Sequence, residues 1–269
     1  MDIPKEVEKV LTDYMNLMNE HLPGTLEGLY VHGSIALDAY VDGSSDIDFI
    51  TVTSRPLTTD DSEALLKVHH TLELTYEKPE MDGVYIQWKD MGKLYREKSD
   101  LNEAYAFYND GELQFGHYFN FNPVTWWTLK NGGISIVGQD PASFDYGVTE
   151  QDLYSYVLTN MNTYWANRLQ TVENTADSIV ALSSEQIDEE VEWTVLGLLR
   201  QFYTLREKGI ISKLDAGKYG LEVVPAEWHP IITEAINIRK GVIVRYYDSE
   251  AERIHDVIRF SKYLIRECN

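Results

Sequence analysis

Apolar positions recur at spacings of three and four residues in several long segments, and this periodicity predicts amphipathic helices. The repeat in residues 1–20 is made by Val7, Val10, Leu11, Tyr14, Leu17 and Met18. Pro23 and Gly24 follow and are expected to end that helix. The same periodicity predicts helices over residues 58–74, 150–171, 188–208, 228–240 and 248–267.

Short apolar runs bounded by turn residues predict strands at 26–32, 47–52 and 83–88. Between the first two strands, residues 35–40 leave room for a helical turn or two. Strand and helix patterns mix up to about residue 140, and only helical patterns follow. We therefore predict an α+β fold with a mixed sheet and helices in residues 1–149 and an all-helical domain in residues 150–269.

Composition narrows the range of partners. Hydrophobic residues make up 43% of the chain, enough to bury a core. The chain has 23 Lys and Arg against 44 Asp and Glu, a net charge of −21. Binding a nucleic acid requires cations that neutralise phosphates, so we expect no nucleic-acid partner. The acidic balance suits a small cationic partner, or it only keeps the protein in solution.

The single cysteine, Cys268, excludes a disulfide framework and a cysteine-based zinc site within one chain. The first residues lack the apolar region of a signal peptide, and the sequence has no apolar run of about 18 residues. We therefore expect a cytoplasmic protein with no membrane partner, acting as a monomer.

Candidate chemistry gathers in residues 32–49. Gly33 and Ser34 follow a predicted strand and open a short helix, where backbone N–H groups favour phosphate oxygens. Asp46 and Asp48 are two apart on the next strand, so both carboxylates point to the same face. Such a pair repels itself unless a divalent cation lies beside it, and Mg²⁺ prefers these oxygen ligands. Ser45 precedes the acids and could donate to a phosphate.

Each part alone has a simpler interpretation. A Gly-Ser pair is typical of a turn, and an Asp-x-Asp pair of a solvated strand end. The order strand, Gly-Ser, short helix and Asp-x-Asp strand is far more specific. This combination resembles the signature of the DNA-polymerase-β-like nucleotidyltransferases, and the chain looks like the bacterial streptomycin and spectinomycin adenylyltransferases. Further stretches that carry the likeness are residues 112–116, 136–138, 150–153, 200–203, 213 and 216–220.

The resemblance implies a role for each matching residue. Asp46 and Asp48 would hold two Mg²⁺ ions, and the nucleotide phosphates would lie against Gly33, Ser34 and Ser45. The third acid of the family falls at Asp82, which would accept the proton of the attacking hydroxyl. Glu80, two residues earlier, is its rival.

The helical domain would supply cations to the triphosphate of ATP through Arg200 and Lys213. On the side of the antibiotic, Tyr118 falls where the family has an aromatic residue. Glu190 falls near an acid that binds the amino groups of the drug.

Residues 169–199 contain Glu173, Asp177, Glu185, Asp188, Glu189, Glu190 and Glu192 and no Lys or Arg. Acids around a cleft would select an aminoglycoside or aminocyclitol, because close opposite charges attract. The alternative is a solvated helix start whose acids complement the helix dipole.

The expected activity is transfer of AMP from ATP to a hydroxyl of a cationic antibiotic of the spectinomycin or streptomycin class, with release of pyrophosphate. Two alternatives stay open. One is the same architecture acting on another small alcohol or on a protein hydroxyl, and the other is a nucleotide-binding module without catalysis. The pair Asp46 and Asp48 argues against the second, because a non-catalytic module has no need of it.

Overall fold

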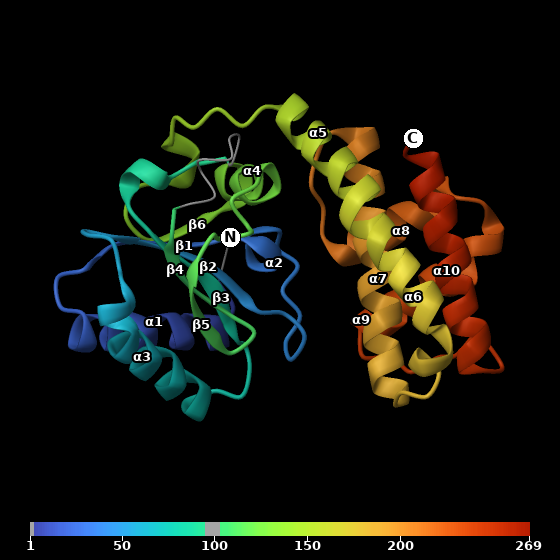
Figure 1. The fold of residues 1–269 in the computed structure, drawn as a ribbon, viewed down its shortest axis with the longest axis horizontal. Helices are drawn as coiled ribbons and strands as arrows, with labels where there is room; N and C mark the ends of the chain where they lie inside the picture. Colours follow the sequence, from blue (N-terminus) through green and yellow to red (C-terminus); the bar gives the residue numbers. More distant parts are fainter. Residues whose placement is uncertain (1–2, 95–102) are drawn as a thin grey trace. The chain divides into compact units, whose positions relative to one another are not determined.

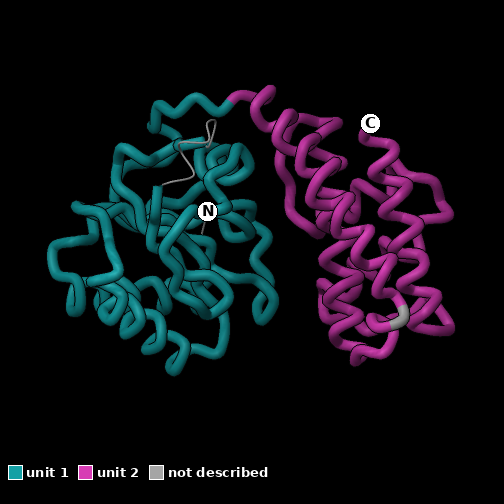
Figure 2. The backbone as a smooth tube through the Cα atoms, in the orientation of Figure 1, with its two compact units in different colours: residues 1–148 teal, residues 149–269 magenta. Residues whose placement is uncertain are grey.

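The computed structural model describes residues 3–94 and 103–269, except for the side chain of Asp177. The chain divides into two compact units, residues 1–148 and 149–269 (Figure 2). Unit 1 combines a sheet with helices and unit 2 is helical, which confirms the predicted α+β class. No helix in the described parts of the chain is long and apolar enough to cross a membrane.

Within its described residues, unit 1 has one six-stranded sheet with the order β5-β4-β3-β2-β1-β6. The strands are β1 (Leu26–Val31), β2 (Ile47–Thr53), β3 (Met81–Ile86), β4 (Tyr105–Asn109), β5 (Glu112–Gly116) and β6 (Ile134–Val137). β2 and β3 pair in parallel, and the other neighbours pair antiparallel. A parallel pair needs a long crossover; here it contains α3 (Ser62–Thr75), preceded by the 3₁₀ turn η1 (Thr59–Asp61).

Helices cover both faces of this sheet (Figure 1). α1 (Lys5–His21) and α3 pack on one face, where Ile47 and Phe49 of β2 join their core. α4 (Pro123–Gly132) belongs to the core on the other face, together with Ile50 and Val52. Side chains alternate along a strand, so Asp48 belongs to the face of α4.

The third strand lies two residues earlier than the sequence pattern predicts. β3 ends at Ile86, and Trp88–Asp90 form the 3₁₀ turn η2 instead of strand. The reason is a pair of reciprocal hydrogen bonds. The Asp90 carboxylate accepts the backbone N–H of Gln87, and the Gln87 side chain accepts the backbone N–H of Asp90. A second short element, α2 (Gly33–Ala36), follows β1 directly, and η4 (Pro141–Ser143) follows β6.

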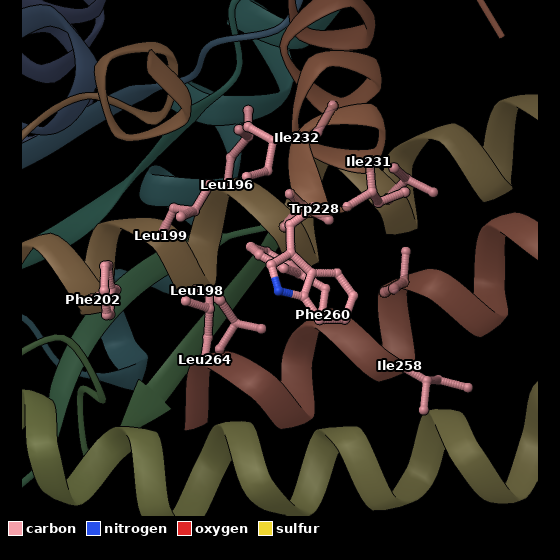
Figure 3. Packing of buried hydrophobic residues seen from close by; sticks show 14 of the residues in the cluster. Leu196, Leu198, Leu199, Phe202, Trp228, Ile231, Ile232, Ile258, Phe260 and Leu264 are labelled. Carbon is pink, nitrogen blue, oxygen red and sulfur yellow. The ribbon is translucent and has the colours of Figure 1, made fainter. Parts of the chain in front are cut away.

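Unit 2 is built around α7 (Ser184–Glu207), which packs against α5, α8, α9 and α10. The other elements are α5 (Glu150–Asn160), the π-helical turn η5 (Met161–Trp165), α6 (Ala166–Ile179), α8 (Lys213–Val223), η6 (Ala226–Trp228), α9 (His229–Arg239) and α10 (Glu250–Glu267). Figure 3 shows the central packing, where Leu198 of α7 lies near Trp228 and near Leu264 and Phe260 of α10. The apolar stripe of the predicted helix 188–208 is this buried face.

α8 was not among the predicted helices, because Gly217 and Gly220 interrupt its pattern. Both glycines are buried against neighbouring helices. A Cβ atom on Gly217 would lie 2.6 Å from Cγ1 of Ile236. The glycines therefore serve close helix packing, although glycine costs a helix about 1 kcal/mol relative to alanine.

A buried ion cluster joins three elements of unit 2. Arg253 of α10 is 1% exposed, and its Nε donates to Oε1 of the fully buried Glu234 of α9 at 2.5 Å. The same guanidinium donates to Glu250 and to Asp188 of α7. Removing one member of such a cluster leaves uncompensated buried charge.

We predict that Arg253→Met lowers the free energy of unfolding by about 3–5 kcal/mol, because it leaves the Glu234 carboxylate without its cation. Lys262→Met is the matched control on the same helix, since Lys262 pairs with Glu173 at an exposed position. The control should cost less than about 1 kcal/mol. Urea denaturation of the three proteins measures both, and equal small losses would contradict the prediction.

Candidate active site

The parallel pairing of β2 and β3 places two acids next to each other. Asp48 and Asp82 are direct partners across the two strands. The register is fixed at the strand starts, where the N–H of Ile47 donates to the carbonyl of Glu80 at 2.8 Å. Two acids that are 34 positions apart in sequence thereby meet on one face of the sheet.

Asp46 adds a third carboxylate at the same end of the sheet. Asp46 and Asp48 are half-buried, whereas Ile47 and Phe49 between and after them are fully buried. This alternation is what strand geometry requires of two acids on one face. The negative charge of Asp46 contributes to raising the pKa of Asp82.

Gly33 lies directly against Asp48. Its φ of +63° is in the left-handed region that favours glycine, and a Cβ atom there would lie 1.8 Å from Oδ2 of Asp48. The N–H of His32 also donates to the carbonyl of Asp48 at 3.0 Å. The turn after β1 is thus held against the acidic strand, and only glycine leaves room for the carboxylate.

The two predicted serines take different positions. Ser34 is half-buried in the first turn of α2, and its carbonyl accepts the N–H of Ala39 at 2.9 Å. Ser45 is 3% exposed, and its Oγ accepts the N–H of Val41 at 3.0 Å. Ser45 closes the loop between α2 and β2, so in this structure it positions the segment that leads into Asp46.

The pKa of the Asp82 carboxyl group is raised well above its ordinary value. This pKa rises from 3.8 to about 7. Partial burial is the largest cause, and the charges of Asp46, Asp110 and Asp48 add to it. The N–H of Asp110 donates to Oδ1 of Asp82 at 3.1 Å and opposes the rise. A carboxylate with a pKa near neutrality suits a general base.

The donor set fits a hard divalent cation. Mg²⁺ takes carboxylate oxygens together with water and substrate phosphates, and Asp46 and Asp48 offer carboxylates beside a third acid. No set of three or more His, Cys, Asp or Glu side chains in the described ranges forms a complete metal site by itself. Phosphate oxygens of a substrate would therefore have to supply the remaining ligands.

Glu80 is placed differently from Asp82. It precedes β3, and its Oε1 is 2.7 Å from Nζ of Lys78. The Lys78 ammonium also lies near Asp46 and Asp82, whose charges help to raise its pKa. The geometry favours Asp82 as the third acid, because it is the one aligned with Asp48.

Sequence reasoning missed Lys78 and Asp110. Lys78 has no spacing that marks it. The Asp110-Gly111 pair between two apolar runs is a hairpin signal that could have located Asp110.

In unit 2 the structure brings Arg200 and Lys213 together. The positive charge of Arg200 acts on Lys213 and contributes to lowering its pKa, although burial is the largest cause. Arg200 Nε donates to the carbonyl of Ile211 at 3.1 Å. Two further residues join them: Glu192, a member of the acidic stretch, and Arg239, which no sequence pattern marks. Glu192 and Arg239 are 47 positions apart, so no local sequence pattern predicts their contact.

The two residues predicted to contact the antibiotic are engaged in packing and ion pairing. Tyr118 of unit 1 is 3% exposed, and its ring packs 5.3 Å from those of Phe107 and Phe121. Glu190 of unit 2 accepts Nη2 of Arg168 at 2.5 Å and Oγ1 of Thr194 at 2.6 Å. A drug-binding role for either residue stays a prediction, and it would require these contacts to change.

The acidic stretch 169–199 is largely compensated by cations from elsewhere in unit 2. Four of its acids form ion pairs: Glu173 with Lys262, Asp188 with Arg245 and Arg253, Glu190 with Arg168, and Glu192 with Lys213 and Arg239. These pairs favour a structural role for much of the stretch over an open acidic cleft.

The raised pKa of Asp82 predicts a pH effect on stability. The folded carboxyl group titrates near 7 and the unfolded one near 3.8, so the folded state binds more protons between these values. Stability therefore falls as pH rises through this window. In metal-free protein, Asp82→Asn should raise the melting temperature above that of the parent protein at pH 8 and change it little at pH 4. Asp60→Asn, at an exposed position, is the control and should show no such pH dependence.

Two comparisons relate this geometry to known proteins. Residues 161–266 match the family described as "Aminoglycoside adenylyltransferase, C-terminal domain". The whole chain is similar in fold to the crystal structure of the spectinomycin adenyltransferase AAD(9) from Enterococcus faecialis, solved with ATP and spectinomycin. The TM-score is 0.66 at 18% identity, covering 95% of this chain and 99% of that one. No curated protein sequence matches significantly.

The family match lies within unit 2, and the fold likeness extends over both units. Residues 161–266 are thus similar to the C-terminal domain of aminoglycoside adenylyltransferases, and the chain as a whole shares the fold of a spectinomycin adenyltransferase.

Proposed function

We propose that the protein transfers AMP from ATP to a hydroxyl group of an aminoglycoside or aminocyclitol antibiotic of the spectinomycin or streptomycin class. The observation that carries this proposal is the placing of Asp48 beside Asp82, with Asp46 near and Gly33 against Asp48. The family of the helical unit supports it, as does the similar fold of an enzyme solved with ATP and spectinomycin.

Each acid has a distinct task in this reaction. Asp46 and Asp48 would hold two Mg²⁺ ions, which when bound neutralise triphosphate charge and favour in-line attack. Asp82 accepts the proton of the acceptor hydroxyl, and its pKa of about 7 leaves a large fraction able to do so at neutral pH. The hydroxyl oxygen bonds to the α-phosphorus as the bond to the β-phosphate oxygen breaks. Pyrophosphate leaves with that electron pair.

The phosphates are also bound by this chain's own donors. Gly33 and Ser34 open α2 with backbone N–H groups, and Ser45 orders the loop before Asp46. From unit 2, Arg200 and Lys213 supply positive charge to the triphosphate. Lys213 is held within the chain by an ion pair to Glu192, so its ammonium is directed before nucleotide binds.

A second acceptor class is favoured by one observation. Tyr118 is buried and Glu190 is paired with Arg168, so the residues matched to drug contacts are occupied within the fold. The same nucleotidyl transfer could then act on another small alcohol or a protein hydroxyl. Pyrophosphate release with ATP and Mg²⁺, measured alone and with spectinomycin, streptomycin and other aminoglycosides, separates these acceptors. Release stimulated by no antibiotic would contradict the antibiotic proposal.

We predict that Asp46→Asn and Asp48→Asn each abolish pyrophosphate release while the protein stays folded. Each substitution removes a metal-binding oxygen and also relieves repulsion between carboxylates, which favours the metal-free fold. Asp42→Asn, in the same loop but exposed, should retain parent activity. Near-normal turnover in Asp46→Asn or Asp48→Asn would contradict the assignment of that residue as a metal ligand.

Asp82→Asn should reduce turnover by roughly 10²–10⁴, the usual contribution of a general base, with ATP affinity largely kept. Glu80→Gln should have a small effect, because Glu80 is paired with Lys78 rather than aligned with Asp48. Steady-state kinetics of the two variants tests the choice. If Glu80→Gln shows the large loss, Glu80 is the base.

A further inference from the structure

Three helices of unit 2 bring two cations onto one buried carboxylate. Glu192 of α7 is 8% exposed. Nζ of Lys213, in the first turn of α8, lies 3.2 Å from Oε2 of Glu192. Nη1 of Arg239, in the last turn of α9, lies 3.5 Å from Oε1 of the same carboxylate. Glu192 thus bridges two side chains that belong to different helices.

The bridge has more positive than negative charge among its members. Burial lowers the pKa of Lys213, and the charges of Arg239 and Arg200 lower it further, while Glu192 raises it. Two cations therefore contact one carboxylate, and the charge of a third, Arg200, acts on Lys213. Lys213 Nζ donates a hydrogen bond to Oε2 of Glu192 at 3.2 Å, whereas the buried Oε1 faces Arg239 at 3.5 Å and accepts no hydrogen bond from the described residues. Such an arrangement is suited to a polyanion, which would balance the excess charge.

We propose that Glu192 is a positioning residue that holds Lys213 and Arg239 side by side, so that both cations bind the phosphates of the nucleotide. The proposal rests on the proposed function, in which Lys213 contacts the triphosphate, and it adds Arg239 as a second cation at the same place. Without the carboxylate, the ammonium and guanidinium groups repel each other. Lys213 then loses its proton more easily or turns away from the phosphates.

The test is the pH dependence of ATP binding by the full-length protein, measured by calorimetry with Mg²⁺ between about pH 7 and 9.5. Phosphate ionisation is complete over most of this range, because its second pKa is about 6. In Glu192→Gln, ATP should bind more weakly, and the pH at which affinity falls should move down by about one unit, as for loss of a close opposite charge. Glu192→Asp keeps the charge and should restore most of the parent profile.

Arg239→Gln should shift the pH dependence of ATP affinity in the opposite direction. This variant tests the proposal even if Glu192→Gln fails to fold. It removes a cation, so ATP should again bind more weakly, but the fall in affinity should move to higher pH because Lys213 is less repelled. The matched control is Glu207→Gln. Glu207 lies on α7 and accepts a hydrogen bond from Tyr219 of α8 at 2.6 Å. It should bind ATP as the parent protein does.

The outcomes separate this inference from the function on which it rests. If the parent protein does not bind ATP, the proposed function fails. If the parent protein binds ATP and Glu192→Gln has the same pH profile, Glu192 has no positioning role. Tighter ATP binding by Glu192→Gln at every pH would mean that this carboxylate only opposes the phosphates, which also overturns the proposal.

Discussion

The parallel pairing of β2 with β3 is the constraint on which the candidate active site depends. Backbone hydrogen bonds hold Asp48 beside Asp82, and the pKa of Asp82 is raised mainly by burial, with smaller contributions from the charges of Asp46, Asp110 and Asp48. Burial of apolar residues on both faces of the sheet offsets the unfavourable free energy of holding these acids close together. A strained electrostatic arrangement is therefore supported by an ordinary hydrophobic core.

Unit 2 handles charge in the opposite way. The chain has a net charge of −21, yet the buried acids of this unit are bound to arginine and lysine from neighbouring helices. Arg253 joins α10 to α7 and α9, and Glu192 joins α7 to α8 and α9. The half-buried carboxylates of the candidate site in unit 1 repel one another, whereas Glu192 and Glu234 of unit 2 are paired with cations. The carboxylates of unit 1 suit a cationic ligand, and the cations around Glu192 in unit 2 suit an anionic one.

The sequence alone predicted the elements whose apolar spacing is regular. α1, β2 and the face of α7 that contains Leu198 follow from periodicity, and Asp46 and Asp48 could be placed on one face because strand side chains alternate. The end of β3 is predicted two residues late, because the hydrogen bonds between Gln87 and Asp90 start a 3₁₀ turn that the apolar pattern does not reveal. Helix α8 was missed because its glycines serve contacts made by other helices. The bridge of Glu192 to Arg239 depends on tertiary packing, so no local pattern contains it.

The position of Lys213 depends on how closely α8 packs against α9 at Gly217. It lets α8 approach α9 so closely that a methyl group would lie 2.6 Å from Ile236, and Lys213 stands one turn earlier on the same helix. A larger residue at this position would displace the helix as a rigid rod and carry the ammonium group with it. Mutational drift far from any reacting atom could thus erode nucleotide affinity. In laboratory evolution of this protein, buried glycines of α8 should tolerate fewer substitutions than exposed residues on the same helix.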